Sequence, residues 1–164
     1  MTISQGAQAN LNGKVFENMM IPIFEANSFK VFSEKEVKKK PQLIEGLDKY
    51  VLKNVFYETI YGEGGKTEFV IVIGERRIRV EAKYQSAAGS VDEKYPYMLL
   101  NGIYKYPEKE IIFVVDGGGY KPGARKWLDD HIKDNWLDYK SSGRDIKLMN
   151  IMEFVKWFNH EFAE

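Results

Sequence analysis

The stretch IRVEAKYQ, residues 78–85, alternates apolar and polar side chains. Because successive side chains of a β-strand point to opposite faces, this pattern predicts a strand with one apolar face. The other face would carry Arg79, Glu81, Lys83 and Gln85 in one row. Such a row is either a solvated surface or half of a metal-dependent active site, and the residues around it decide between the two.

The residues before this stretch predict its partner strand. Residues 67–73 form a nearly continuous apolar run in which Glu68 comes second, and residues 74–76 form a turn. An antiparallel hairpin about this turn would pair Glu68 with Ala82 or Lys83, and such cross-strand neighbours lie about 4.5–5.5 Å apart. In this arrangement Glu68 reaches the polar row if its side chain shares that face, whereas a slip of one residue turns it away.

Two carboxylates at this separation suit the chemistry of phosphodiester hydrolysis. Glu68 and Glu81 could hold a hard divalent cation whose shell is completed by water. The ion acidifies a bound water and stabilises charge on a phosphoryl oxygen. Lys83 is placed to orient that water or to offset negative charge in the transition state. Gln85 could position water or substrate on the same face.

The spelling Glu-x-Lys carries little information by itself. It occurs again at residues 36–38, in a stretch that reads as a charged helix capped by Ser33, and as Asp-x-Lys at residues 145–147. The second copy lies on a predicted strand, but no acidic strand precedes it. The setting of residues 81–83 therefore distinguishes them from the other two copies.

Composition narrows the chemistry further. The 164 residues suit a single domain spanning 1–164, with residues 1–10 expected to be flexible, and 44% hydrophobic and 29% charged residues are ordinary for a globular protein. The absence of cysteine excludes thiolate nucleophiles and cysteine zinc sites, and the only histidines are His131 and His160. Any metal should thus be held by carboxylates, which favours Mg²⁺, Mn²⁺ or Ca²⁺. Without signal-peptide blocks or long apolar runs, a soluble cytoplasmic protein is expected.

Apolar periodicity and turn residues predict a mixed α/β fold. Helices are expected near 12–27, from Ser33 to about 41, over 90–105 from a Ser90–Glu93 capping box, over 121–133, and after Asn150. Strands are expected over 29–32, 50–60, 67–73, 78–85, 111–115 and 145–149. This order predicts one mixed sheet flanked by helices, with an α-β-β-β-α-β core.

Two glycine-rich segments resemble phosphate-binding loops. GEGGKT, residues 62–67, lacks a glycine at residue 60 and precedes a strand, so a hairpin turn is the better interpretation. DGGGYKPG, residues 116–123, follows a buried strand and opens a helix. A tight strand-to-helix turn is favoured there, with a phosphate contact helped by Lys121, Arg125 or Lys126 as the alternative.

Taken together, these features resemble the PD-(D/E)XK nuclease superfamily. The resemblance rests on Glu81-Ala82-Lys83 at the end of a strand, on Gln85 in an E-x-K-x-Q variant, on Glu68 in the preceding strand, and on the element order. Residues 13–17, GKVFE, are similar to the first-helix segment of such nucleases, whose glutamate, here Glu17, approaches the metal site. Residues 89–94, GSVDEK, resemble the segment after the catalytic strand.

The resemblance implies a restriction-endonuclease-like domain that cuts DNA with Mg²⁺, for which Mn²⁺ would substitute. Glu68 and Glu81 would be the ligands, although the family usually has aspartate at the first position, so Asp92 or Glu93 could serve in place of Glu68. Ser90, Lys94, Lys121 and Arg125 would contact substrate. A domain this small would need a homodimer to cut both strands. The alternatives are a non-catalytic nucleic-acid-binding or interaction protein on the same fold, and an unrelated small α/β protein.

Overall fold

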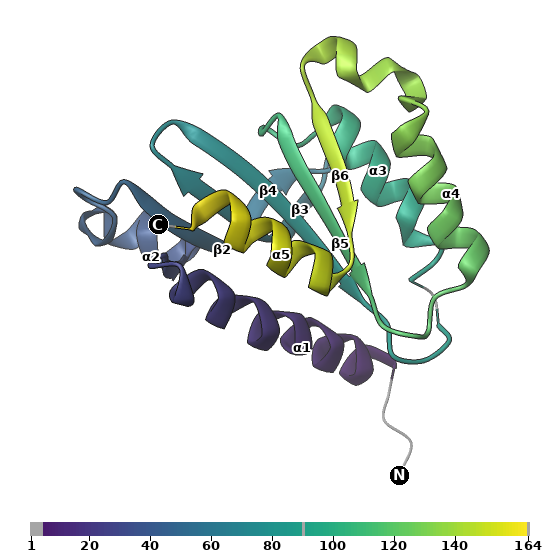
Figure 1. Ribbon diagram of the computed structural model, residues 1–164, viewed down its shortest axis with the longest axis horizontal. Helices are drawn as coiled ribbons and strands as arrows, with labels where there is room; N and C mark the ends of the chain where they lie inside the picture. Colours follow the sequence, from purple (N-terminus) through teal and green to yellow (C-terminus); the bar gives the residue numbers. More distant parts are fainter. Residues whose placement is uncertain (1–4, 90, 164) are drawn as a thin grey trace.

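The protein is built around one six-stranded mixed sheet (Figure 1). The computed structural model describes residues 5–89 and 91–163. The strands lie in chain order: β1 (Lys30–Ser33), β2 (Lys49–Glu58), β3 (Gly64–Ile73), β4 (Arg76–Tyr84), β5 (Glu110–Asp116) and β6 (Asp145–Met149). The β1–β2, β4–β5 and β5–β6 pairs are parallel, whereas β3 is antiparallel to both of its neighbours. The prediction of a mixed sheet flanked by helices is confirmed.

Helices connect β1 to β2, β4 to β5 and β5 to β6, and helices cover both faces of the sheet. They are α1 (Gln5–Ala26), α2 (Glu34–Lys39), α3 (Lys94–Tyr104), α4 (Pro122–Lys133) and α5 (Ile151–Phe162), with short 3₁₀ helices η1 (Pro41–Leu43) and η2 (Trp136–Ser142). In Figure 1, α1 and α5 lie next to each other across one face, and α3 and α4 belong to the other.

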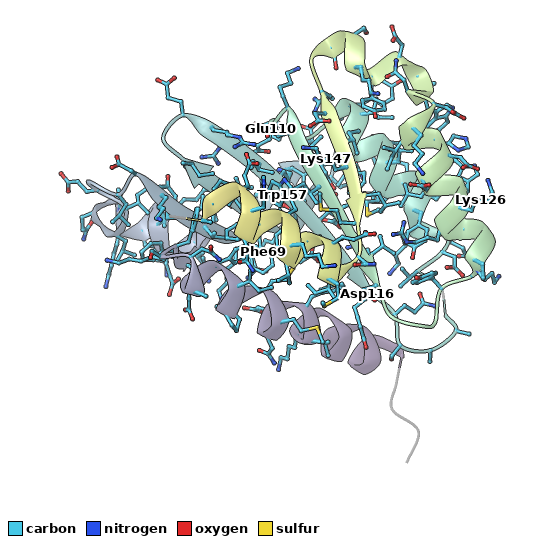
Figure 2. The ribbon with its side chains drawn as sticks, in the orientation of Figure 1. Phe69, Glu110, Asp116, Lys126, Lys147 and Trp157 are labelled. Atoms are coloured by element: carbon cyan, nitrogen blue, oxygen red, sulfur yellow. The ribbon has the colours of Figure 1, made fainter. Side chains whose placement is uncertain are left out.

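The alternation of β5 separates two apolar cores. Ile112 and Val114 pack in the core formed with α1 and α5, whereas Ile111, Phe113 and Val115 pack in the core formed with α3 and α4. Because both faces of β5 are buried, its sequence is a continuous apolar run. Phe69 of β3, labelled in Figure 2, lies in the α1/α5 core with its ring 5.1 Å from that of Phe24.

Several predicted elements are present with the expected bounds. β6 and α4 agree with their predicted ranges, and Ser33 caps α2 through a capping box with Glu36. The helix predicted to start at Ser90 begins instead at Lys94, and Glu93 makes no side-chain cap there. Pro96 explains the later start, since proline is tolerated in the first turn of a helix but not in its interior. Ser90 itself lies outside the described residues.

The amino-terminal segment is helical earlier than expected. α1 begins at Gln5 rather than near residue 12, so residues 5–10 of the segment predicted to be flexible form its first turns. The remaining residues of that segment, 1–4, lie outside the described part. A search of the described helices finds none with the length and apolar character that crossing a bilayer requires.

Candidate active site at the split between β3 and β4

A paired distortion interrupts β2 and β3 in the middle of the sheet. Lys53 pairs with Phe69 and Val55 with Thr67, but Asn54 and Glu68 between them form no pair. Asn54 has φ 55°, in the left-handed region that asparagine tolerates better than most residues. The regular alternation of β3 ends here, because Phe69 faces the α1/α5 core whereas Thr67 bonds to a side chain on the opposite face. Glu68 thus lies where the strand changes its facing.

β3 also separates from β4 at Glu68. The last recorded pair of their ladder is Phe69 with Val80, and beyond it Oε2 of Glu68 accepts a hydrogen bond of 2.8 Å from the backbone N–H of Ala82. In a regular ladder the N–H of Ala82 would donate to a backbone carbonyl of β3. Here the carboxylate of Glu68 accepts that hydrogen bond instead. This register differs by one or two residues from the predicted pairing of Glu68 with Ala82 or Lys83, because the turn is tighter, with Ile73 paired to Arg76.

The split brings together the three charged side chains predicted to form the site. The Nζ of Lys83 lies 2.5 Å from Oε1 of Glu81 and 3.7 Å from Oε1 of Glu68. The Glu81 side chain is 7% exposed, whereas those of Lys83 and Glu68 are 25% and 27% exposed. One carboxylate is thus held inside the protein, and the other two groups can be reached from solvent.

Burial and mutual charge shift the protonation equilibria of this cluster. Burial, followed by the negative charge of Glu68, raises the pKa of the Glu81 carboxyl well above its usual range. Burial lowers the pKa of Lys83, but the charges of Glu68 and Glu81 outweigh it, so the net shift of the Lys83 pKa is upward. At neutral pH Lys83 therefore carries a positive charge between the side chains of Glu68 and Glu81.

The donor set fits a hard divalent cation. Oε2 of Glu81 is buried and has no hydrogen-bond partner among the described residues, and an orphaned carboxylate oxygen is costly unless something binds it. Carboxylate oxygens with water are the ligands that Mg²⁺ prefers. In the described part of the chain, however, no three His, Cys, Asp or Glu side chains gather in a group that could hold a metal. Glu68 and Glu81 could therefore offer two ligands at most, and Oδ1 of Asp92 instead accepts from Lys121 N at 3.0 Å.

A buried arginine forms hydrogen bonds to β2 and β3 beside the distorted pair. Arg79 is 1% exposed and forms an ion pair with Glu108, whose side chain is 3% exposed. Its Nη1 donates to Oγ1 of Thr67 at 2.9 Å and to the carbonyl oxygen of Val55 at 3.3 Å. Thr67 precedes Glu68, and Val55 follows Asn54. Arg79 therefore fixes β2 and β3 immediately beside the distorted pair.

Two tyrosines complete this support. The guanidinium of Arg79 lies 5.3 Å from the ring centroid of Tyr106 and 5.8 Å from that of Tyr57. Burial, followed by the charge of Glu81, raises the pKa of Tyr57 to about 12. Tyr57 is consequently a neutral phenol beside the site at neutral pH. Neither tyrosine was expected from the sequence.

A pocket of about 390 Å³ connects Glu68 with α1. Its lining includes Lys14, Glu17, Lys53, Asn54 and Glu68. Oε1 of Glu17 accepts a hydrogen bond from Nζ of Lys53 at 2.7 Å. The predicted first-helix glutamate therefore lies in the lining of this pocket, paired with Lys53. Sequence reasoning missed Lys53 and Asn54, although an asparagine inside an otherwise β-branched and aromatic strand is a recognisable irregularity.

The side chain of Gln85 forms its hydrogen bonds with two loops. Its side-chain amide donates to the carbonyl of Gly119 at 3.0 Å and accepts from Val91 N at 3.1 Å. It is 3% exposed. Gln85 thus joins the loop after β4 to the loop after β5, and within the described residues its amide forms no hydrogen bond with Glu81 or Lys83.

The glycine-rich segment after β5 packs against this same loop. A Cβ on Gly119 would lie 2.3 Å from the carbonyl oxygen of Ala87, and Gly117 has φ +95°. These constraints explain the glycines as a tight strand-to-helix turn. Asp92 accepts from Lys121 N at the start of α4, so a carboxylate already occupies one donor that the phosphate-contact alternative would use.

The remaining candidate residues lie around the same end of the sheet. Lys94 begins α3 and Lys121 precedes α4, both with exposed side chains, and Arg125 is half-buried in the first turns of α4. The other two acid-x-lysine copies have local partners. The Glu36 carboxylate accepts from Ser33 N in the capping box of α2, and Asp145 pairs with Lys147 at 3.3 Å on β6.

Comparison with known proteins finds a family match over most of the chain. The family model of the PD-(D/E)XK nuclease superfamily domain matches residues 8–162 of the 164-residue chain. The search of curated proteins and the search of solved structures found no match. The match spans α1 through α5 and includes Glu17, Glu68, Glu81 and Lys83.

Proposed function

Because the chain belongs to the PD-(D/E)XK nuclease superfamily, we propose that it is a metal-dependent DNA endonuclease. The meeting of Glu68, Glu81 and Lys83 at the split between β3 and β4 carries this proposal. Proteins of this superfamily are usually nucleases and typically use divalent metals. Mg²⁺ is the proposed ion, with Mn²⁺ able to substitute.

Glu68 and Glu81 would hold the cation through Oε1 of Glu68 and the orphaned Oε2 of Glu81. When bound, such an ion acidifies water and stabilises charge on a phosphoryl oxygen. In hydrolysis the water oxygen bonds to phosphorus, the bond to the leaving oxygen breaks, and the proton that the water loses is balanced by one that the leaving oxygen gains. Lys83, whose pKa is raised, remains protonated. It therefore donates to the water or to a phosphate oxygen and does not act as the base.

Residues around the cluster have supporting roles in this proposal. Glu17 orients Lys53 beside the pocket, and Gln85 holds the loop that leads into α3. Lys94, Lys121 and Arg125 would contact phosphates at the carboxyl ends of β4 and β5, together with Ser90. Cutting both strands of a duplex would require a homodimer that presents one site to each strand.

One observation favours a second candidate function. Nζ of Lys83 already lies within ion-pair distance of both Glu68 and Glu81, as it would in a stable cluster without catalysis. The chain would then be a non-catalytic nucleic-acid-binding or interaction protein on the same fold.

A plasmid-nicking assay separates these candidates. Wild type, Glu81→Gln and Lys83→Met are incubated with Mg²⁺ or Mn²⁺ and supercoiled, linear, branched or single-stranded DNA. Asp145→Asn and Lys147→Met provide a matched control, since they alter an acid-x-lysine pair of the same spacing on β6. We expect cleavage by wild type and by both controls but not by the two site variants. Cleavage by both site variants would exclude the proposed site, and wild type inactive on every substrate would exclude the proposed function.

A further inference from the structure

A second groove lies beside the pocket that contains Glu68. It has a volume of about 760 Å³ and lies between α2, β2 and β3. Lys53 and Asn54 line both this groove and the pocket that contains Glu68. The two hollows are therefore adjacent, and a chain-like ligand lying in the groove would reach the proposed site.

The groove is basic although the chain as a whole has no net charge. Its lining contributes five lysines, Lys35, Lys38, Lys39, Lys53 and Lys66, against the two carboxylates of α2. Lys38 pairs with Glu34 at 3.2 Å and Lys53 with Glu17 at 2.7 Å. Within the described residues, the other three lysines have no ion pair. The excess positive charge suits a polyanion.

An exposed aromatic ring lies among these lysines. Phe56 is 51% exposed, which is unusual for a phenylalanine in the middle of a strand. Gly64 lies against one part of the ring, since a Cβ at Gly64 would come within 3.0 Å of it. The Nζ of Lys38 lies 6.0 Å from the ring centroid, at the outer limit of a cation–π contact. The ring is thus held by the sheet and remains open to a ligand.

We infer that this groove binds a single strand of nucleic acid, with an unpaired base stacked on Phe56 and the backbone phosphates along the lysines. Aromatic platforms within basic grooves bind single strands in this way, because every unpaired base offers a flat face. A regular duplex keeps its bases stacked on one another and offers Phe56 no such face. This inference rests on the proposed function and specifies its substrate: a strand that is unpaired where it approaches Glu68.

Binding measured without catalysis tests the inference. Fluorescence anisotropy in EDTA follows a labelled single-stranded DNA of about 15 nucleotides, a length within the usual site sizes, and the same sequence as a duplex. Phe56→Ala should weaken single-strand binding about 5- to 100-fold and leave duplex binding nearly unchanged. Phe56→Tyr should retain it. Tyr104→Ala removes a similarly exposed aromatic on α3, 57% exposed, and should have no effect.

The lysines are tested by salt dependence. Lys66→Ala should lower the slope of log affinity against log salt on the single strand by about 0.7, whereas Lys156→Ala, which alters an exposed lysine of α5, should not. Thermal unfolding of each variant shows whether it is folded. If poly-glutamate displaces the labelled strand as well as unlabelled single-stranded DNA does, the groove recognises charge alone. That result overturns the inference.

The outcomes also separate this inference from the proposed function. If wild type cleaves DNA but Phe56→Ala binds single strands normally, or loses duplex binding equally, the inference is wrong and the nuclease proposal stands. If wild type cleaves nothing but Phe56→Ala loses single-strand binding selectively, the groove is a binding site and the nuclease proposal fails.

Discussion

Removing Glu108 should destabilise the protein by about 3–5 kcal/mol, because it leaves the charge of Arg79 buried without its partner. Arg79 is 1% exposed and the Glu108 side chain 3% exposed. In Glu108→Gln the guanidinium keeps its bonds to Thr67 and to the carbonyl of Val55, and the amide oxygen at residue 108 can still accept a hydrogen bond, but no negative charge balances the guanidinium. Since an arginine cannot lose its proton in a protein, this penalty should not change between pH 5 and pH 8.

Arg79→Met should behave differently with pH. It leaves Glu108 with Arg77 at 3.5 Å, whose side chain is 42% exposed. Unlike a guanidinium, the buried carboxylate left without Arg79 can take up a proton as the pH falls. The destabilisation should therefore be largest near pH 8 and should shrink toward pH 5. Replacing both residues by leucine should recover much of the lost stability, because neither charge is then left buried without its partner.

Urea unfolding at pH 5, 6, 7 and 8 measures these differences. For a protein of this size, 3–5 kcal/mol corresponds to a fall in Tm of roughly 6–20 °C. Arg76→Met provides the control, because its pairs with Glu110 and Glu161 join side chains that are 33–38% exposed and should contribute about 1 kcal/mol or less each. A loss below 1 kcal/mol in Glu108→Gln, or the same pH profile in both single variants, would refute the reasoning.

Three further predictions concern the site and its loops. Lys83→Met should lower the rate of DNA cleavage about 10²- to 10³-fold while leaving the affinity for DNA, measured by anisotropy, nearly unchanged; an equal loss of affinity would count against its proposed role. The metal-free protein should lose stability relative to Glu81→Gln as the pH rises above 4.5, because the pKa of Glu81 is raised in the folded state and its protonated form is the stable one there. Calorimetric scans across pH test this, and parallel curves would contradict it. Gly119→Ala should lower the Tm because its Cβ would meet the Ala87 carbonyl at 2.3 Å, whereas Gly118→Ala, with nothing within 4 Å, should not; equal Tm values would show that the loop gives way.

Elements whose burial is simple were predictable from the sequence. The apolar run of β5 indicated a strand buried on both faces, and it pairs with β4 and β6. Ser33 and Asn150 cap their helices because a short polar side chain can satisfy the first backbone donors. The pairing of Glu81 with Lys83 followed from alternation along one strand. In each of these cases one local rule determines the result.

The details of the site depended on several strands at once. The hairpin register is set by a turn of two residues, so an error of one residue in its centre moves every pair. Gln85 seemed to extend the polar row, but the glycine turn after β5 packs against its backbone and its side chain bonds the neighbouring loops. From the sequence, Asn54 was only an unusual residue within a predicted strand. Its role in the distortion is clear only once Glu68 is known to lie opposite it on β3.

Three features that each cost stability lie on neighbouring elements around the site. Asn54 adopts left-handed backbone in a strand, Oε2 of Glu81 is buried without a partner, and Arg79 is buried with Glu108. Each would be easy to avoid in a regular sheet, where Glu68 would lie in an unbroken ladder. Departures from local rules concentrate at functional sites because the geometry they produce is needed there. Here that geometry is an opening between β3 and β4 into which Glu68 turns, so the proposed metal binding would give the distortion and the carboxylate pair a common explanation.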